Sequence, residues 1–151
     1  MSEKPNFSGP ELCRLSAYKV VGMLKAGDIS TADLIDSATR RIAKTGPIIN
    51  ATPTLCKDRA LRATLNLKES DHAGWLAGLP ISIKDLNSVA GVRTTFGSKG
   101  FSDFIPQESD PLVEKLEARG GVVLGKTNTP EFGAGGNTFN DIFGPTLNPW
   151  N

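Results

Sequence analysis

Apolar residues in the first 50 positions recur three or four residues apart, the spacing of amphipathic helices. A first helix is predicted up to Gly27, because a glycine can adopt the left-handed conformation that caps a helix. A second helix is predicted after Ser30, with Asp33 in its first turn. We expect this second helix to stop at Gly46 and Pro47.

The segment between this helix and residue 70 predicts an extended run followed by a third helix. Residues 48–55 are apolar and threonine-rich, and residues 57–69 carry leucines at helical spacing. We therefore expect residues 1–70 to form a helical amino-terminal segment that serves as a scaffold.

From Gly74 onward the pattern changes to short strands between glycine-rich turns, with 12 of the 16 glycines lying between Gly74 and Gly144. Residues 79–85 alternate, so that one face of a strand carries Leu79, Ile81 and Ile83 and the other carries Ser82 and Lys84. Residues 122–124 form a continuous apolar run, typical of a strand that is buried on both faces.

Between these strands, Asp110 and Pro111 predict a helix start, and Gly120 with Gly121 predicts its end. The order is therefore strand, helix, strand, and two parallel strands are the expected outcome. The carboxyl ends of parallel strands meet at one edge, so Lys84 and Thr127 should lie near each other there. The Gly-, Pro- and Asn-rich residues that follow predict a long ordered loop.

A formal net charge of +1 with 22% charged residues gives no basic stripe or acidic tail. Neither nucleic acid nor a membrane is therefore expected as a partner, and a small molecule fits better. Residues 1–10 contain no apolar stretch of the signal-peptide kind, and we expect a cytoplasmic protein. Cys13 and Cys56 match no metal-ligand spacing and are expected to be free thiols. His72, the one histidine, lies in a polar stretch and is expected to be exposed.

Gly120, Gly125, Lys126 and Thr127 match the phosphate-loop pattern G-x-x-x-x-G-K-T. A phosphate loop needs irregular backbone followed by a helix, whereas here the residues between the glycines are the predicted strand. Pro130 and further glycines follow where that helix should begin. We therefore expect that Lys126 does not bind phosphate.

Lys84 is the strongest candidate for a catalytic residue, because it stands at the carboxyl end of a strand. If it is partly withdrawn from water, the cost of burying charge lowers its pKa toward values useful to a general base. The alternative is a lysine that reaches solvent or pairs with the adjacent Asp85. Position alone leaves both interpretations open.

Four blocks in the second half of the chain resemble the amidase-signature family: GLPISIKD from Gly78, GVRTTFGSKGF from Gly91, GGVVLGKTNTPEF from Gly120 and FGPTLNPWN from Phe143. They occur in family order and cover about half of the chain. The resemblance implies an α/β fold in which amino-terminal helices precede the first βαβ part of a mixed sheet. Residues 71–151 would form that part, and the domain would be incomplete.

The resemblance also implies amide hydrolysis by a triad of serine, cis-serine and lysine, without cofactor or metal. Lys84 matches the lysine of the family's K-D pair, which acts as the base, and Asp85 would then be structural. The loop that borders the acyl group would include Phe132, Gly133, Ala134 and Gly135. The substrate would be a small amide, and a homodimer is a possible assembly of the full-length protein.

The family's glycine-serine segment, which supplies both serines, is not found within these 151 residues. We therefore expect the chain by itself to be inactive. Two alternatives stay open beside an amidase acting on small carboxamides. One is the glutaminase-type subunit of a tRNA-dependent amidotransferase, and the other is a truncated, non-catalytic binding or oligomerisation piece.

Overall fold

The first helices begin and end at the capping residues that the sequence indicates. The structure, a computed structural model, describes residues 9–150, so most of the 1–10 segment and Asn151 lie outside it. A short 3-10 helix, η1 (Glu11–Arg14), precedes α1 (Ala17–Ala26). Gly27 caps α1 with a φ of 77°, which confirms the predicted end of this helix.

Helix α2 (Thr31–Ile49) begins as predicted but runs past the predicted stop. Ser30 and Asp33 form the capping box, each bonding to the other's backbone. The stop at Gly46 and Pro47 is wrong, because Pro47 lies inside the helix and Asn50 caps it with a φ of 53°.

Contacts from distant residues hold this last turn of α2. The Asn50 side chain donates hydrogen bonds to the carbonyl oxygens of Phe143 and Pro145, at 2.6 and 3.0 Å. The Leu147 amide donates to the Ile49 carbonyl at 2.8 Å. A local pattern cannot anticipate such bonds, because their partners lie far apart in the sequence.

The predicted extended run and third helix are both present in the rest of the first 70 residues, but their boundaries differ from the prediction. The extended run narrows to β1 (Thr54–Leu55), because residues 48 and 49 belong to α2. The third helix, α3 (Lys57–Thr64), stops before the predicted end at residue 69. Cys13 and Cys56 are free thiols, as expected, and burial raises the pKa of each.

The second half contains the predicted βαβ unit. Strand β2 (Pro80–Lys84) leads through a loop with a short 3-10 helix, η2 (Lys99–Phe101), to α4 (Pro111–Ala118) and then β3 (Val122–Thr127). Strands β2 and β3 are parallel, as predicted, and β1 joins β3 antiparallel, which gives a mixed sheet of order β1-β3-β2. The sheet thus draws strands from both sides of residue 70, and the division into two segments stays a prediction.

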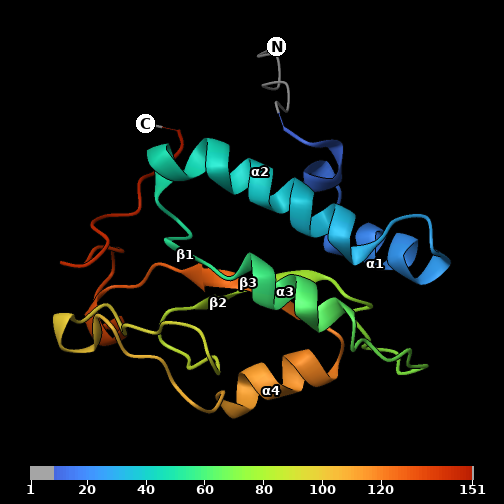
Figure 1. Ribbon diagram of the computed structural model, residues 1–151. Helices are drawn as coiled ribbons and strands as arrows, with labels where there is room; N and C mark the ends of the chain where they lie inside the picture. Colours follow the sequence, from blue (N-terminus) through green and yellow to red (C-terminus); the bar gives the residue numbers. More distant parts are fainter. Residues whose placement is uncertain (1–8, 151) are drawn as a thin grey trace.

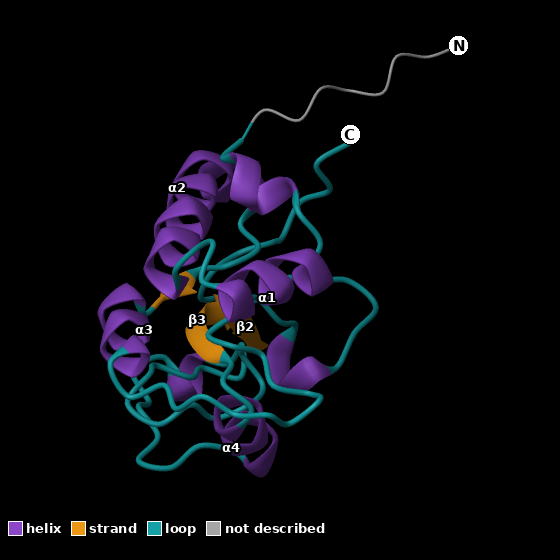
Figure 2. Ribbon diagram, turned by 90° about the vertical axis from the view of Figure 1, so that its right-hand side faces the viewer, coloured by secondary structure: helices purple, strands orange, loops and turns teal. Residues whose placement is uncertain are grey.

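The sheet lies between two helical layers (Figure 1). Helices α2 and α3 cover one face, where Ile35 and Ala60 pack against Val122 and Leu124 of β3. Helix α4 covers the other face, where Val113 packs in a cluster with strand and loop residues Ile83, Val89, Val92 and Val123. In the rotated view β2 and β3 lie enclosed between helices and loops (Figure 2).

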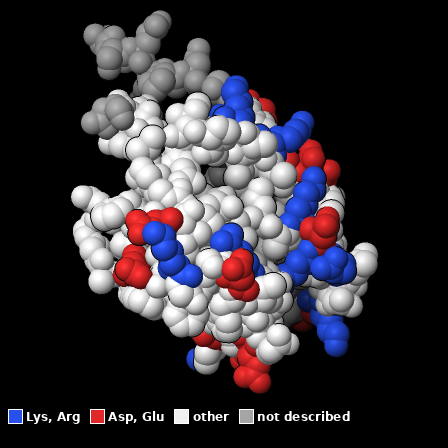
Figure 3. All heavy atoms as spheres, turned by 60° about the vertical axis from the view of Figure 1, so that its left-hand side comes forward, with Lys and Arg blue, Asp and Glu red and all other residues white. Residues whose placement is uncertain are grey.

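The loop after β3 is long and ordered, as predicted, with one short 3-10 helix, η3 (Glu131–Gly133). On the face shown in Figure 3, Lys and Arg groups lie interspersed with Asp and Glu groups, in line with the near-neutral charge. Among residues 9–150, no helix combines the length and the apolar character that a membrane crossing requires.

Candidate active site

The carboxyl ends of β2 and β3 bring the candidate base beside its predicted neighbour. Lys84 pairs in register with Thr127 on the adjacent parallel strand, which confirms the predicted juxtaposition. The Lys84 side chain is exposed, so the expected withdrawal from water is not provided by residues 9–150. Within that described range it makes no ion pair or side-chain hydrogen bond.

A β-bulge in β3 brings a second lysine onto the face of the sheet that α4 covers. Ile81 stands opposite Val123 and Ser82 opposite Gly125, so Leu124 is an extra residue. Without this extra residue, the alternation of side chains from Val123 onward would place Lys126 on the face away from α4. With the extra residue, Lys126 pairs with Ile83 and lies on the face that α4 covers.

The bulge requires a glycine because β1 approaches closely there. A Cβ atom added to Gly125 would lie 2.6 Å from the Thr54 carbonyl oxygen, closer than real Cβ contacts come. Gly125 therefore has a packing role, not the phosphate-binding role of a phosphate loop.

Lys126 and Asp85 form an ion pair that is fully removed from solvent, with side-chain exposures of 0% and 1%. The Lys126 Nζ donates to Asp85 Oδ1 at 3.0 Å and to Thr94 Oγ1 at 2.7 Å. Burial lowers the pKa of Lys126, and the hydrogen bond to Asp85 partly opposes that shift. This arrangement leaves Lys126 unable to reach a phosphate in solution.

The second oxygen of Asp85 organises the loop that follows β2. Asp85 Oδ2 accepts from the Thr95 amide at 3.1 Å and from the Thr95 hydroxyl at 2.5 Å. Asp85 is therefore structural, as the family resemblance implied, and its partner is Lys126. Within residues 9–150 Lys84 forms no ion pair with Asp85, so that part of the alternative is wrong, whereas the exposed Lys84 side chain reaches solvent, as the other part of the alternative predicted.

The network continues to the loop after β3. The Thr95 hydroxyl accepts from the Gly97 amide at 3.0 Å, and Gly97 packs against the backbone of Glu131, where an added Cβ would come within 3.1 Å. The Phe132 amide donates to the Phe96 carbonyl at 2.7 Å. Phe96 and Phe132 both have positive φ, 52° and 49°, a strained conformation that only firm surroundings maintain.

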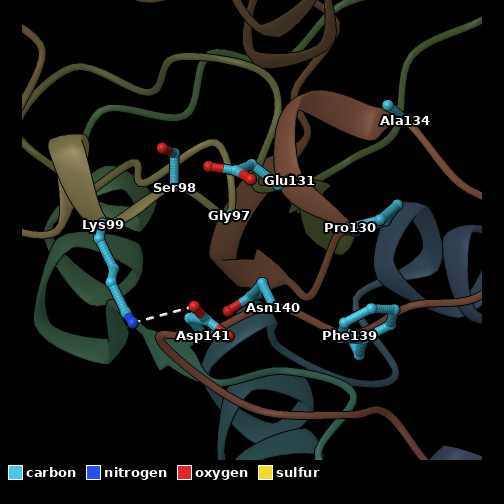
Figure 4. Close-up of a pocket in the computed structure, with 9 residues that line it drawn as sticks. All are labelled: Gly97, Ser98, Lys99, Pro130, Glu131, Ala134, Phe139, Asn140 and Asp141. Atoms are coloured by element: carbon cyan, nitrogen blue, oxygen red, sulfur yellow. Dashed lines mark ion pairs between the residues drawn. The ribbon is translucent and has the colours of Figure 1, made fainter.

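The two loops enclose a cavity of about 320 Å³ (Figure 4). Its lining comes from the loop before η2 and the loop after β3, namely Gly97, Ser98, Lys99, Pro130, Glu131, Ala134, Phe139, Asn140 and Asp141. Among the four predicted substrate-binding residues, only Ala134 lines it. Phe132 is 58% exposed, and Gly133 packs on Leu86, so a substrate-binding role for residues 132–135 stays a prediction.

The pairing of Lys126 with Asp85 does not follow from the sequence interpretation. From the sequence, Lys126 is considered only as a phosphate ligand, a role that its setting excludes. Asp85 is considered only as a structural residue beside Lys84. The available signal is that the G-K-T triplet continues a buried strand, since a lysine there must have a buried anion as its partner. His72 is exposed, as predicted, and its Nδ1 lies 2.7 Å from Arg119 Nη1.

Comparison with known proteins gives a consistent family. The family model described as Amidase matches residues 33–151. The chain is 39% identical over 132 residues to the A subunit of the glutamyl-tRNA(Gln) amidotransferase of Synechococcus sp., covering 85% of the chain and 27% of that protein. It is 36% identical over 140 residues to an acylamidase of Rhodococcus erythropolis, covering 90% and 29%.

Solved structures agree with the sequence relatives. A 6-aminohexanoate cyclic dimer hydrolase superposes with a TM-score of 0.81 at 28% identity, over 91% of this chain and 28% of that one. A bacterial aryl acylamidase of the amidase-signature family superposes with a TM-score of 0.80 at 30% identity, over 91% and 30%. The chain thus spans less than a third of the length of these relatives, and it belongs to the amidase-signature family.

Proposed function

We propose that residues 1–151 contribute the catalytic base to an amidase that hydrolyses a carboxamide C–N bond. Lys84 is the proposed base. In its neutral form its amine takes a proton from a bridging serine, which in turn deprotonates the serine that attacks the carbonyl carbon. The proton then returns to the leaving nitrogen. Both serines would come from polypeptide beyond these 151 residues.

The observation that supports this role most directly is that Asp85 pairs with Lys126 and not with the neighbouring Lys84. Asp85 bonds to Lys126 and Thr95, and among residues 9–150 it forms no ion pair with Lys84. The Lys84 amine is therefore not occupied by a carboxylate partner within the described residues.

A chimera tests the proposal. Residues 1–151 are joined to the unmatched remainder of the Rhodococcus erythropolis acylamidase, and hydrolysis of benzamide is measured. We expect Lys84→Ala to lower turnover by at least about a hundredfold, the scale of a lost general base. The matched control is Lys115→Ala, an exposed lysine on α4, which should leave turnover unchanged. A chimera equally active with and without Lys84 would exclude the role.

The 151 residues by themselves are proposed to be inactive. Purified chain should release no ammonia from benzamide, because it contains no serine in the glycine-serine setting of the family. Activity that persists in the isolated chain and disappears in Lys84→Ala would show that a nucleophile lies within it.

A second candidate is the glutaminase-type subunit of a tRNA-dependent amidotransferase. The 39% identity to the glutamyl-tRNA(Gln) amidotransferase protein supports it. The two candidates differ in substrate and partners, since the subunit would act on glutamine only together with other subunits. Ammonia release from glutamine, but not from benzamide, by an extended chain with added partner subunits would favour the second candidate.

A further inference from the structure

The cavity between the η2 loop and the loop after β3 has firm walls. Asn140 forms one of them and has no free hydrogen-bonding group, because its amide nitrogen donates to Asn128 and Thr129 and its oxygen accepts from two backbone amides. Gly97 forms another and is held through Thr95 by the buried Asp85. Such fixed walls lower the entropic cost of binding a small ligand.

Two polar groups of the cavity remain available. Among residues 9–150, neither the Glu131 carboxylate nor the Ser98 hydroxyl makes a side-chain hydrogen bond or ion pair. Figure 4 shows the Glu131 carboxylate extending toward Ser98. Ser98 is 8% exposed and is one of the residues that line the cavity.

The charges of the cavity select the kind of ligand. Lys99 Nζ lies 2.9 Å from Asp141 Oδ2, so these opposite charges are paired at the rim, as the dashed line in Figure 4 marks. Glu131 then leaves the cavity with one net negative charge. An anion is disfavoured, whereas a cation with N–H donors can bond to the carboxylate and the hydroxyl together.

The remaining walls favour a short apolar tail on that cation. Pro130, Ala134 and the Phe139 ring line the cavity beside the polar groups (Figure 4). A volume of about 320 Å³ is at the small end of the range for ligand sites, so a small molecule has room to enter. We propose that this cavity binds small primary alkylammonium ions, with Glu131 as counter-ion and Ser98 as hydrogen-bond acceptor.

The strained backbone next to the cavity supports this assignment. Phe96 and Phe132 hold positive φ on the two segments that carry Gly97 and Glu131, and a hydrogen bond joins these segments. Strain of this kind concentrates at sites where a side chain must be aimed. The proposal does not involve Lys84, so it stands or fails independently of the amidase reaction.

The test is an NMR titration of the 151-residue chain with n-butylammonium chloride. We expect saturable shifts of the Ser98, Glu131 and Asp141 amides with a millimolar dissociation constant. Sodium butyrate and n-butanol, which match the tail but lack the ammonium group, should give no saturable shifts. Saturation by butyrate or butanol, or linear shifts with the ammonium ion, would overturn the proposal.

Two substitutions with opposite expected effects on affinity identify the residues that contact the bound ion. Glu131→Gln should weaken n-butylammonium binding by about tenfold or more, because it removes a charge-assisted hydrogen bond. Lys99→Met should tighten it by about two- to fivefold, because it leaves Asp141 uncompensated at the exposed rim. A gain in affinity cannot result from a misfolded variant, so this second arm decides the outcome even if Glu131→Gln is unstable.

The matched control is Glu108→Gln, which removes an exposed carboxylate outside the cavity and should leave the dissociation constant unchanged. Equal weakening by Glu108→Gln and Glu131→Gln would mean a general charge effect, and unchanged binding in both Glu131→Gln and Lys99→Met would place the ion elsewhere. Either result refutes the site.

Discussion

The ends of β2 and β3 lie side by side, yet their lysines occupy opposite environments. Lys84 is exposed and has no partner among residues 9–150, whereas Lys126 is fully buried and bonded to Asp85 and Thr94. The comparison shows that two lysines on adjacent strand ends can differ completely in burial and bonding. Lys126 is held in a buried ion pair, whereas Lys84, the proposed base, is exposed.

Among the substitutions that test this difference between the two lysines, Lys126→Ala should have the largest effect on stability. It leaves the Asp85 carboxylate buried without its cation, and removing one partner of a buried pair costs about 3–5 kcal/mol. We expect the free energy of unfolding, measured by urea denaturation, to fall by that amount. Lys84→Ala is the matched control and should change it by less than about 0.5 kcal/mol, as for an exposed residue. Similar losses in both variants would contradict the division of roles.

Removing both charges sharpens the same point. The double variant Asp85→Asn with Lys126→Met has no buried ion left, so its loss should be smaller than the sum of the single losses by about 1–3 kcal/mol. A double-mutant cycle in urea measures this coupling. Additive losses would indicate that the two side chains contribute independently.

A smaller loss is expected from Gly125→Ala, which challenges the bulge that brings Lys126 to Asp85. The new methyl group would collide with the Thr54 carbonyl, and such overpacking costs about 1–3 kcal/mol. Gly100→Ala is the control, because an added Cβ there meets nothing within 4 Å. Thermal unfolding of the two variants should differ clearly, and equal midpoints would mean that β1 does not constrain this position.

The smallest effect concerns Asp33, an exposed carboxylate that contrasts with Asp85. Hydrogen bonds from the Ser30 side chain and backbone hold the pKa of Asp33 below its ordinary value of 3.8. A lowered pKa means that the capping contribution is present above pH 3.8 and is lost as the pH falls below it. The difference in thermal midpoint between the native chain and Asp33→Asn should therefore be constant near neutrality and shrink in acid. A difference that grows in acid would contradict this sign.

Local patterns were sufficient for the parts of the fold that local physics controls. Gly27 ends α1 through its left-handed backbone and Ser30 begins α2 through its side chain, while Asp110 followed by Pro111 begins α4 without a side-chain cap. The alternation of β2 likewise follows from burial of one face. The strand end at Lys84, and its juxtaposition with Thr127, could therefore be predicted.

The remaining features depend on partners that are distant in sequence. Helix α2 passes Pro47 because its last turn bonds to residues 143–147. The bulge at Leu124 could not be predicted, since a period of two assumes regular pairing. The ion pair of Lys126 with Asp85 depends on that bulge and was missed with it, as was the cavity formed by two separate loops.

The order of strands in the sheet has a consequence for synthesis on the ribosome. The central strand, β3, is the last of the three in the chain, and β1 and β2 each pair with β3 and not with one another. At about 5–20 residues per second, residues 85–127 take roughly 2–9 s to be added after β2 is complete. During that interval β1 and β2 have no strand partner among residues 9–150. The nascent chain therefore depends on its helices, and on any chaperone that shields the waiting strands, until β3 emerges.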